Sequence, residues 1–249
     1  MIIGLTKVRN EEEIITATLD NWAEHCDAIH VYDDASTDDT VALCRKHPAV
    51  VEVVTSDCLD PDRLRAEWYN RNLILQSALR FNPDWVCYFD ADEWLYDFDD
   101  DAMDDPRIVR IDCPLYDVHI TPEDVDSMPS ERQWIDPTPR VIGFFFRAGS
   151  VPLYYDTPDQ RIMHHARGGR AITGRVKHFG KGWSVAQWEK KCNYYADVFG
   201  HPAYIDKWRA RRGKAIKADY KSDTGDPLIR WDDEWTLSSK HTEIMNVMA

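Results

Sequence analysis

The stretch WVCYFDADEW, residues 85–94, is the strongest indication in this chain of both its fold and its chemistry. Its apolar first half has the length and composition of a strand buried on both faces, as in the middle of a parallel sheet. The carboxylates Asp90, Asp92 and Glu93 follow at once. Open α/β sheets bind ligands beyond the carboxyl ends of their strands, and Asp90 and Asp92 project to the same face of an extended chain. The pattern therefore indicates either a site for a hard divalent cation, Mg²⁺ or Mn²⁺, or an acidic turn that caps the next segment.

Strand and helix patterns alternate through the first third of the chain. Asn10 and Ser36 each precede acidic residues in the arrangement that caps a helix, and residues 63–81 have a helical pattern. Strands separated by helices of this length imply βαβ units, and hence an α/β fold with a mostly parallel sheet flanked by helices. The strands are predicted over residues 2–8, 28–32, 50–55 and 85–89.

The second half of the chain has a looser pattern. Short apolar runs predict further strands over residues 108–111 and 141–146. Ser184 is predicted to cap an amphipathic helix, and residues 207–221 form a basic segment with helical character. No internal repeat or linker is evident, so we expect one domain followed by a C-terminal extension.

The composition is that of an acidic globular protein. The chain has 44 acidic and 30 basic residues, a net charge of −14. General nucleic-acid binding is excluded, since it requires a positive surface, and an anionic substrate would need a local cation. The six cysteines are scattered without a C-x-x-C pair and are expected to be reduced thiols. The N-terminal apolar segment is too short for a signal peptide and no run is long enough to span a membrane, so we expect a cytoplasmic protein.

Several short motifs occur in a characteristic order along the chain. They are T-K-V-R-N-E at 6–11, D-D-A-S-T-D at 33–38, R-N at 71–72, D-A-D-E at 90–93 and V-K-H-F-G at 176–180. This order resembles the family-2 glycosyltransferases of GT-A fold, in particular the small branch with a K-V-R-N-E-E opening and a D-A-D-E metal motif. The resemblance is dense over residues 1–94, thin as far as about residue 200, and absent beyond.

The resemblance implies a fold and an activity. The fold is a Rossmann-like, mostly parallel sheet in one GT-A-like domain over residues 1–221, with a helical C-terminal extension over 222–249. Residues 1–110 would bind the nucleotide sugar, and residues 111–221 would form the acceptor and lid half. The implied activity is a metal-dependent, inverting transfer of a hexose from a nucleotide donor, UDP, to a carbohydrate or other hydroxyl acceptor. A divalent cation, Mn²⁺ or Mg²⁺, would stabilise the departing diphosphate, whose negative charge increases.

The same resemblance assigns roles to individual residues. Asp34 would hydrogen-bond the base, Asp92 would be the direct metal ligand, and His178 would complete the metal site. Three of the assigned residues have a simpler explanation. Asp34 is then a turn residue, Arg71 is half of a helix-surface salt bridge, and His178 is a structural histidine. The residues assigned to the donor are Thr6, Val8, Arg9, Glu11, Asp34, Arg71, Asp90 and Ala91, and those assigned to the metal are Asp92, Asp90 and His178.

The catalytic base has no clear counterpart in the sequence. An inverting enzyme needs an Asp or Glu that deprotonates the acceptor hydroxyl. Asp159 and Asp156, in YYDTPDQR, are the first candidates, followed by Asp117 and Glu131.

Other classes of protein also place an Asp-X-Asp at a strand end. A nucleotidyltransferase or a metal-dependent phosphohydrolase is one alternative, although the chain lacks a glycine-rich phosphate loop after its first strand. A non-catalytic module that binds a nucleotide sugar is another, favoured if no acceptor-side base exists.

Overall fold

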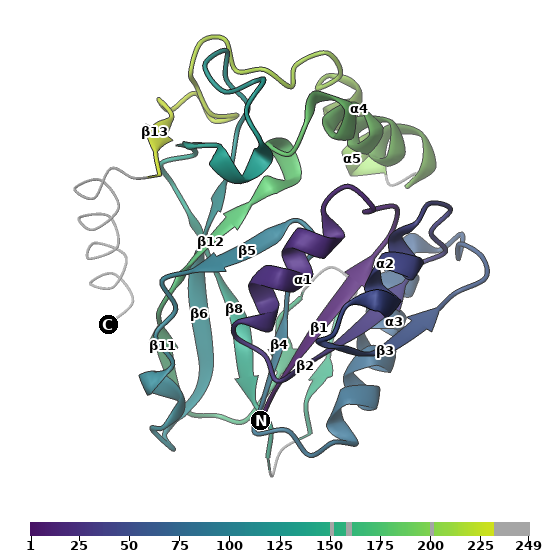
Figure 1. Ribbon diagram of the computed structural model, residues 1–249, viewed down its shortest axis with the longest axis vertical. Coiled ribbons are helices and arrows are strands. Elements are labelled where there is room, and N and C mark those ends of the chain that lie inside the picture. Colours follow the sequence, from purple (N-terminus) through teal and green to yellow (C-terminus); the bar gives the residue numbers. More distant parts are fainter. Residues whose placement is uncertain (150–151, 158–160, 200–201, 232–249) are drawn as a thin grey trace. The chain divides into compact units, whose positions relative to one another are not determined.

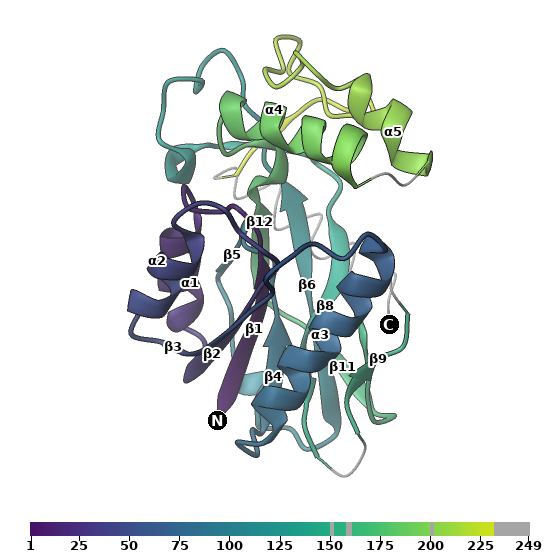
Figure 2. The same cartoon turned by 90° about the vertical axis from the view of Figure 1, so that its right-hand side faces the viewer.

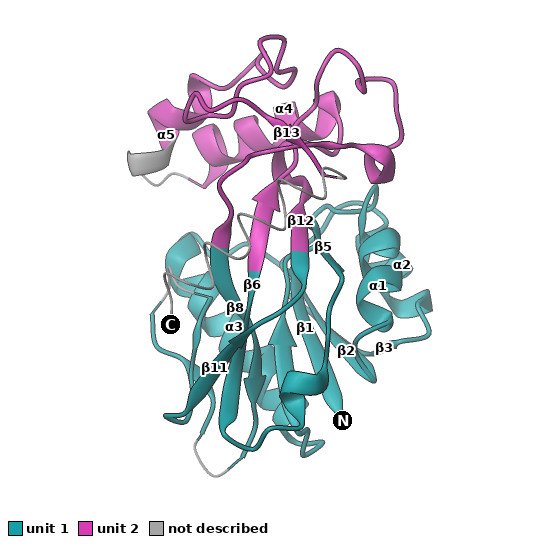
Figure 3. Cartoon of the chain, turned by 90° about the vertical axis from the view of Figure 1, so that its left-hand side faces the viewer, with its two compact units in different colours: residues 1–113, 141–175 teal, residues 114–140, 176–249 magenta. Residues whose placement is uncertain are grey.

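The computed structural model describes residues 1–149, 152–157, 161–199 and 202–231 (Figure 1). The chain divides into two compact units (Figure 3). Unit 1 comprises Met1–Cys113 and Val141–Arg175, and unit 2 comprises Pro114–Arg140 and Val176–Ala249. Among the described residues, no helix combines the length and the apolar character needed to cross a membrane.

Unit 1 is built on a sheet whose first four strands are parallel. They are β1 (Ile2–Val8), β2 (Ala28–Asp33), β3 (Val50–Thr55) and β4 (Trp85–Tyr88), in the order β3-β2-β1-β4. Strand β8 (Arg140–Arg147) is antiparallel to β4 and continues the sheet. Strands β6 (Ile108–Asp117) and β11 (Gly169–Ile172) also belong to it. The predicted α/β class with a mostly parallel sheet is confirmed, and the first four strands lie within one residue of their predicted ranges.

Helices cover both faces of this sheet. Helices α1 (Ile15–Ala23) and α2 (Thr40–Lys46) lie on one face and α3 (Arg63–Leu79) lies on the other (Figure 2). The remaining elements of unit 1 are β5 (Glu93–Tyr96), η1 (Asp101–Met103), β9 (Tyr154–Tyr155) and β10 (Met163–His164).

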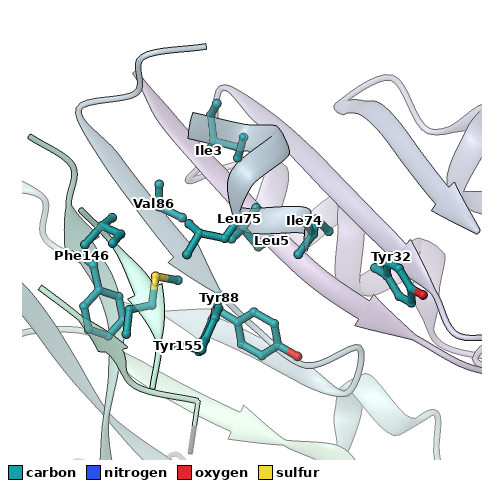
Figure 4. Close-up of a cluster of buried hydrophobic side chains, with 12 residues drawn as sticks. Ile3, Leu5, Tyr32, Ile74, Leu75, Val86, Tyr88, Phe146 and Tyr155 are labelled. Atoms are coloured by element: carbon teal, nitrogen blue, oxygen red, sulfur yellow. The ribbon is translucent and has the colours of Figure 1, made fainter. Parts of the chain in front are cut away.

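The period of two along the strands divides the core between these faces. On the face covered by α1, the Trp22 ring stacks on Phe89 with a centroid distance of 4.4 Å. On the face covered by α3, Ile3 and Leu5 of β1 and Val86 and Tyr88 of β4 pack against Ile74 and Leu75 of the helix (Figure 4). Each fully buried side chain of this kind contributes about 1.5–3 kcal/mol, which fixes the strand ends in space.

Two predicted helix caps are wrong. Asn10 has a φ of 54°, outside the extended region that an N-cap adopts, and α1 begins only at Ile15. The Ser36 hydroxyl accepts the Asn10 N–H, so it is not available to the helix that follows, and Asp39 precedes α2 instead. The two loops thus bond to each other rather than to their own helices. By contrast, Asp62 caps α3 by accepting the Arg65 N–H at 3.0 Å.

Unit 2 begins with the end of β6, which pairs in parallel with β12 (Arg175–His178). A two-stranded sheet pairs β7 (Trp134–Ile135) with β13 (Ile229–Arg230). Its helical elements are η2 (Pro129–Glu131), η3 (Phe179–Lys181), α4 (Val185–Asn193), η4 (Tyr194–Val198) and α5 (Pro202–Arg209).

The helices of unit 2 differ in part from the prediction. Ser184 caps α4 as predicted, accepting the Gln187 N–H at 3.0 Å. The predicted helix over residues 207–221 is wrong, because α5 ends at Arg209 and Gly213 has a φ of 69°, which breaks a right-handed helix.

Candidate active site

A polar cleft of about 570 Å³ opens in unit 1 at the carboxyl ends of β1, β2 and β3. Its volume is in the range of small-molecule sites, and its position is the one at which open α/β sheets bind ligands. The lining residues are Arg9, Asp33, Ala35, Ser36, Thr37, Val41, Arg45, Thr55, Ser56, Asp57, Cys58 and Leu59.

The two loops beside this cleft hold each other in strained conformations. Asn10 Oδ1 accepts the Thr37 N–H at 2.8 Å, and the Asn10 N–H donates to Ser36 Oγ at 2.9 Å. Ala35 has a φ of 58°, a left-handed conformation that costs a residue with a Cβ roughly 1–2 kcal/mol. Such strain persists only where the surroundings determine it, and it concentrates at functional sites.

Asp34 lies at the base of these loops and is bound within the protein. Its side chain is almost fully buried; Arg63 forms an ion pair with it, and Lys7 Nζ lies 3.2 Å away. Burial opposes ionisation, but Arg63 and Lys7 outweigh it and hold the Asp34 pKa below its usual value. Arg9 Nη1 donates to the Asp34 carbonyl at 2.9 Å, which fixes the loop. Contact of Asp34 with a nucleotide base stays a prediction.

A ladder of charges along α3 continues from Asp34. Arg63, Glu67 and Arg71 are spaced four residues apart, so they share one face of the helix. Glu67 pairs with Lys7 and also with Arg71, whose Nη2 lies 3.2 Å from Glu67 Oε2. Arg71 Nε then donates to the Tyr88 hydroxyl at 3.3 Å. The predicted Arg71 thus lies in a buried network, and its partner Glu67, together with Lys7 and Arg63, was missed from the sequence.

The D-A-D-E motif after β4 divides into residues with different environments. Glu93 is buried; it accepts the Asp90 N–H at 2.9 Å and pairs with Arg161 Nη1 at 2.6 Å. Asp90 has a carboxylate that is 40% exposed, with one oxygen 3.1 Å from the same Arg161 nitrogen. Asp92 is half-buried. Ala91 is buried, and its carbonyl accepts the Thr18 hydroxyl of α1 at 2.5 Å. Glu93 and Arg161 therefore support the turn on which Asp90 and Asp92 are presented.

Asp90 and Asp92 suit a hard divalent cation. Partly exposed carboxylate oxygens are the ligands that Mg²⁺ and Mn²⁺ prefer, with positions left for water or phosphate. Within the described ranges, the only three or more potential ligand side chains whose donor atoms lie within 4.8 Å of one another are Asp99, Asp100 and Asp101. Those three are exposed, and Asp99 accepts the Asp101 N–H, so they form an acidic turn.

The other predicted donor residues of β1 are mostly internal. The side chains of Thr6 and Val8 are buried, while the Val8 carbonyl accepts the Asp34 N–H at 2.9 Å. The Glu11 carbonyl accepts two N–H groups that begin α1. A nucleotide could therefore meet β1 through its carboxyl end and Arg9, whereas the Thr6 and Val8 side chains support the strand.

His178 in unit 2 is oriented by a carboxylate. Its Nδ1 lies 2.5 Å from Asp117 Oδ1, and Asp117 also pairs with Lys181 at 2.8 Å and with Arg140 at 2.9 Å. Burial opposes the charge of Asp117, but His178, Lys181 and Arg140 hold its pKa far below the usual range. A Cβ at Gly180 would lie 2.6 Å from His178 Nε2, so glycine is required to leave the imidazole in place. Asp92 belongs to unit 1 and His178 to unit 2, and their sharing of one ion stays a prediction.

The candidates for the catalytic base have different environments. Asp156 is exposed and follows Tyr155, whose backbone bonds to α3 through Asn72 at 2.9 Å and Trp68 at 2.6 Å. Asp159 lies outside the described residues. Asp117 is a poor proton acceptor because His178, Lys181 and Arg140 stabilise its ionised form.

Glu131, the last of these candidates, is exposed and accepts the Met128 N–H at 3.2 Å. It closes the short helical turn η2, a structural role. Among the candidates in the described part of the chain, Asp156 is therefore the one whose carboxylate is neither held ionised by cations nor used to close a turn.

Known proteins resemble this chain over part of its length. No family model matches the chain. Uncharacterized proteins of Mycobacterium bovis and Mycobacterium tuberculosis are each 36% identical to it over 138 residues, covering 51% of this chain and 33% of theirs. The chain thus spans about a third of the length of these relatives.

Two solved structures are similar in part. TarS 1–349 of S. aureus in complex with UDP has a TM-score of 0.42 and 12% identity, covering 85% of this chain and 70% of that one. Glucosyl-3-phosphoglycerate synthase from Mycobacterium tuberculosis, in complex with Mn²⁺, UDP and glucosyl-3-phosphoglycerate, has a TM-score of 0.31 and 21% identity. That match covers 46% of this chain and 44% of the synthase.

Proposed function

We propose that this protein transfers a sugar from a nucleoside diphosphate donor, with UDP as the nucleotide, to a hydroxyl group of an acceptor. The observation that carries the proposal is the arrangement around β1. The cleft lies at the ends of β1, β2 and β3, and β4 with Asp90 and Asp92 pairs with the other edge of β1. This reversal of strand order is a topological switch point, where doubly wound sheets bind nucleotides. The ordered motifs described above support the same assignment.

The parts of unit 1 then have separate tasks. The cleft beside Ala35 receives the nucleoside, and Asp34 with Lys7 and Arg63 holds its loops in position. Asp92 and Asp90 would hold Mn²⁺ or Mg²⁺, and the ion would supply a Lewis acid for the charge that develops on the leaving diphosphate.

The acceptor is activated by a carboxylate, for which we propose Asp156, with Asp159 as the alternative. The acceptor hydroxyl gives its proton to this carboxylate while its oxygen forms a bond to the anomeric carbon. The bond from that carbon to the diphosphate breaks, so the nucleoside diphosphate leaves and the configuration inverts. Trp68 and Asn72 keep the backbone before Asp156 in a defined position, as a positioned base requires.

Calorimetric titration of UDP tests the donor site. We expect binding with Mn²⁺ present and much weaker binding after EDTA treatment. Arg45→Ala, in the cleft, should weaken binding by about tenfold, the effect of losing one charge-assisted contact. Lys46→Ala is the matched control, because Lys46 is the next exposed residue of α2 and does not line the cleft.

A turnover assay separates transfer from the alternatives. Release of UDP from a UDP-sugar should depend on an added acceptor, and Asp156→Asn should lower turnover while UDP affinity is retained. Release of UMP and sugar 1-phosphate without an acceptor would instead indicate a phosphohydrolase.

A further inference from the structure

Unit 2 contains a cluster of cationic side chains that outnumber the carboxylates with which they form ion pairs. Two carboxylates lie at its centre, and both contact Lys181 Nζ, Asp117 at 2.8 Å and Asp223 at 3.0 Å. The members of this cationic cluster are Arg140, Lys181, Arg211 and Lys217, around Asp117 and Asp223.

The charges of the cationic cluster do not balance. Arg211 and Lys217 pair with Asp223 at 2.7 and 2.6 Å, and Arg140 pairs with Asp117 at 2.9 Å. Four permanently charged side chains thus form ion pairs with two carboxylates, and Asp136, which also interacts with Lys181, is a third carboxylate beside them, so the cations still outnumber the carboxylates. The side chains of Lys181 and Lys217 are only 15% and 18% exposed, so solvent screens this excess positive charge incompletely.

A neighbouring histidine adds no charge to the cationic cluster. His119 is completely buried, and neither of its ring nitrogens has a hydrogen-bond partner among the described residues. Burial, followed by the charges of Lys181 and Lys217, lowers its pKa to about 4, despite the opposing charges of Asp117 and Asp223. The neutral histidine leaves the excess of cations in place.

We infer that the cationic cluster binds a phosphate group of the acceptor substrate. A phosphate monoester carries close to two negative charges, which would neutralise the excess. Arginine and lysine are the side chains that most often bind phosphate. Arg140 is 58% exposed, so the cluster is open to solvent at that end. This inference rests on the proposed function and adds to it the class of acceptor, a phosphorylated hydroxyl compound.

The diphosphate of the donor is the other phosphate group that would suit the cationic cluster. Binding of inorganic phosphate, measured by calorimetry on the full chain in phosphate-free buffer, tests both sources. The titration is carried out with and without saturating UDP and Mn²⁺. A site for the acceptor should bind phosphate equally in both cases, and a site for the donor should lose phosphate when UDP is bound.

Two variants and a control identify the site. Lys217→Gln and Arg140→Gln should each weaken phosphate binding by about tenfold. Both should fold, because Asp223 keeps Lys181 and Arg211, and Asp117 keeps His178 and Lys181. Lys214→Gln removes an exposed lysine of the same segment and should leave the affinity unchanged.

Each other outcome overturns the inference. Absence of phosphate binding, or equal loss in all three variants, would make the cationic cluster structural. Displacement of phosphate by UDP would assign the cluster to the donor. Binding of phosphate without any binding of UDP would refute the proposed function while leaving a phosphate site in unit 2.

Discussion

Asp117 accepts a hydrogen bond from His178 across the paired ends of β6 and β12, with 2.5 Å between Oδ1 and Nδ1. Because Asp117 is ionised, Nδ1 must be the nitrogen that carries the proton. When the imidazole is neutral, its lone pair is therefore on Nε2, as in metal sites where a carboxylate orients a histidine ligand.

If His178 binds the metal, its carboxylate partner should matter almost as much as the histidine. We expect His178→Ala and Asp117→Asn to raise the Mn²⁺ concentration needed for half-maximal activity by about 10–100-fold. A Mn²⁺ titration of activity measures this effect. Asp126→Asn, an exposed carboxylate of the same unit, serves as the control. Unchanged metal dependence in His178→Ala would make the histidine structural.

The D-A-D-E motif should separate into a metal ligand and a structural residue. Asp92→Asn should abolish stimulation by metal with little change in the free energy of unfolding. Glu93→Gln removes the buried carboxylate that pairs with the Arg161 guanidinium. It should therefore destabilise the fold by about 3 kcal/mol. Urea denaturation and metal titration of both variants check the two effects. The reverse result, a stable Glu93→Gln and an unfolded Asp92→Asn, would exchange the two roles.

Asp34 should be necessary for folding as well as for any contact with the nucleotide. Asp34→Ala leaves Arg63, a buried cation, without its carboxylate, and should lower the free energy of unfolding by about 3–5 kcal/mol. Asp39→Ala removes an exposed carboxylate nearby that makes no side-chain cap bond, and should change it by less than about 0.5 kcal/mol. Equal stability of the two variants in urea would show that the Arg63 pair contributes little.

His119 should make the protein sensitive to mild acid. Its pKa of about 4 in the fold lies below the ordinary histidine value of about 6.5, so the unfolded chain binds a proton first as the pH falls. The stability that this residue contributes is complete above pH 6.5 and is lost progressively toward pH 4, by about 3 kcal/mol. His119→Leu should flatten the dependence of the unfolding free energy on pH in that window. Parallel curves for the variant and the wild type would contradict this assignment.

The strain at Ala35 should be relieved by glycine. Ala35→Gly removes the Cβ from a left-handed residue and should stabilise the fold by about 0.5–1 kcal/mol. Ala42→Gly, an exposed position of α2, should destabilise it by about 1 kcal/mol, since glycine disfavours a helix interior. Thermal denaturation should therefore shift in opposite directions for the two variants.

The parallel strands were predictable because their signal is local. Each is a short apolar run that ends at polar residues, and the ends of β1 and β3 were predicted to the residue. The caps at Asn10 and Ser36 could not be predicted, because these residues bond to each other across 26 positions instead of to their own helices.

The carboxylates of the candidate site were visible in the sequence, but their partners were not. Asp90 and Glu93 cannot be told apart in the D-A-D-E motif. In the fold, Glu93 is buried against Arg161, more than 60 residues later in the chain, whereas Asp90 stays partly exposed. The spacing of Arg63, Glu67 and Arg71 on α3 was a usable signal for a charged helix face. It gave no indication that Lys7 would insert between Asp34 and Glu67.

The charge network at the strand ends of unit 1 also bears on the order in which substrates bind. Its cations and carboxylates are equal in number: Lys7, Arg63, Arg71 and Arg161 against Asp34, Glu67, Asp90 and Glu93. These ion pairs leave none of the four cations over to neutralise a diphosphate, so a free nucleoside diphosphate would gain little attraction from the network. We therefore expect the complex of metal and nucleotide, rather than the free nucleotide, to be the species that enters the site.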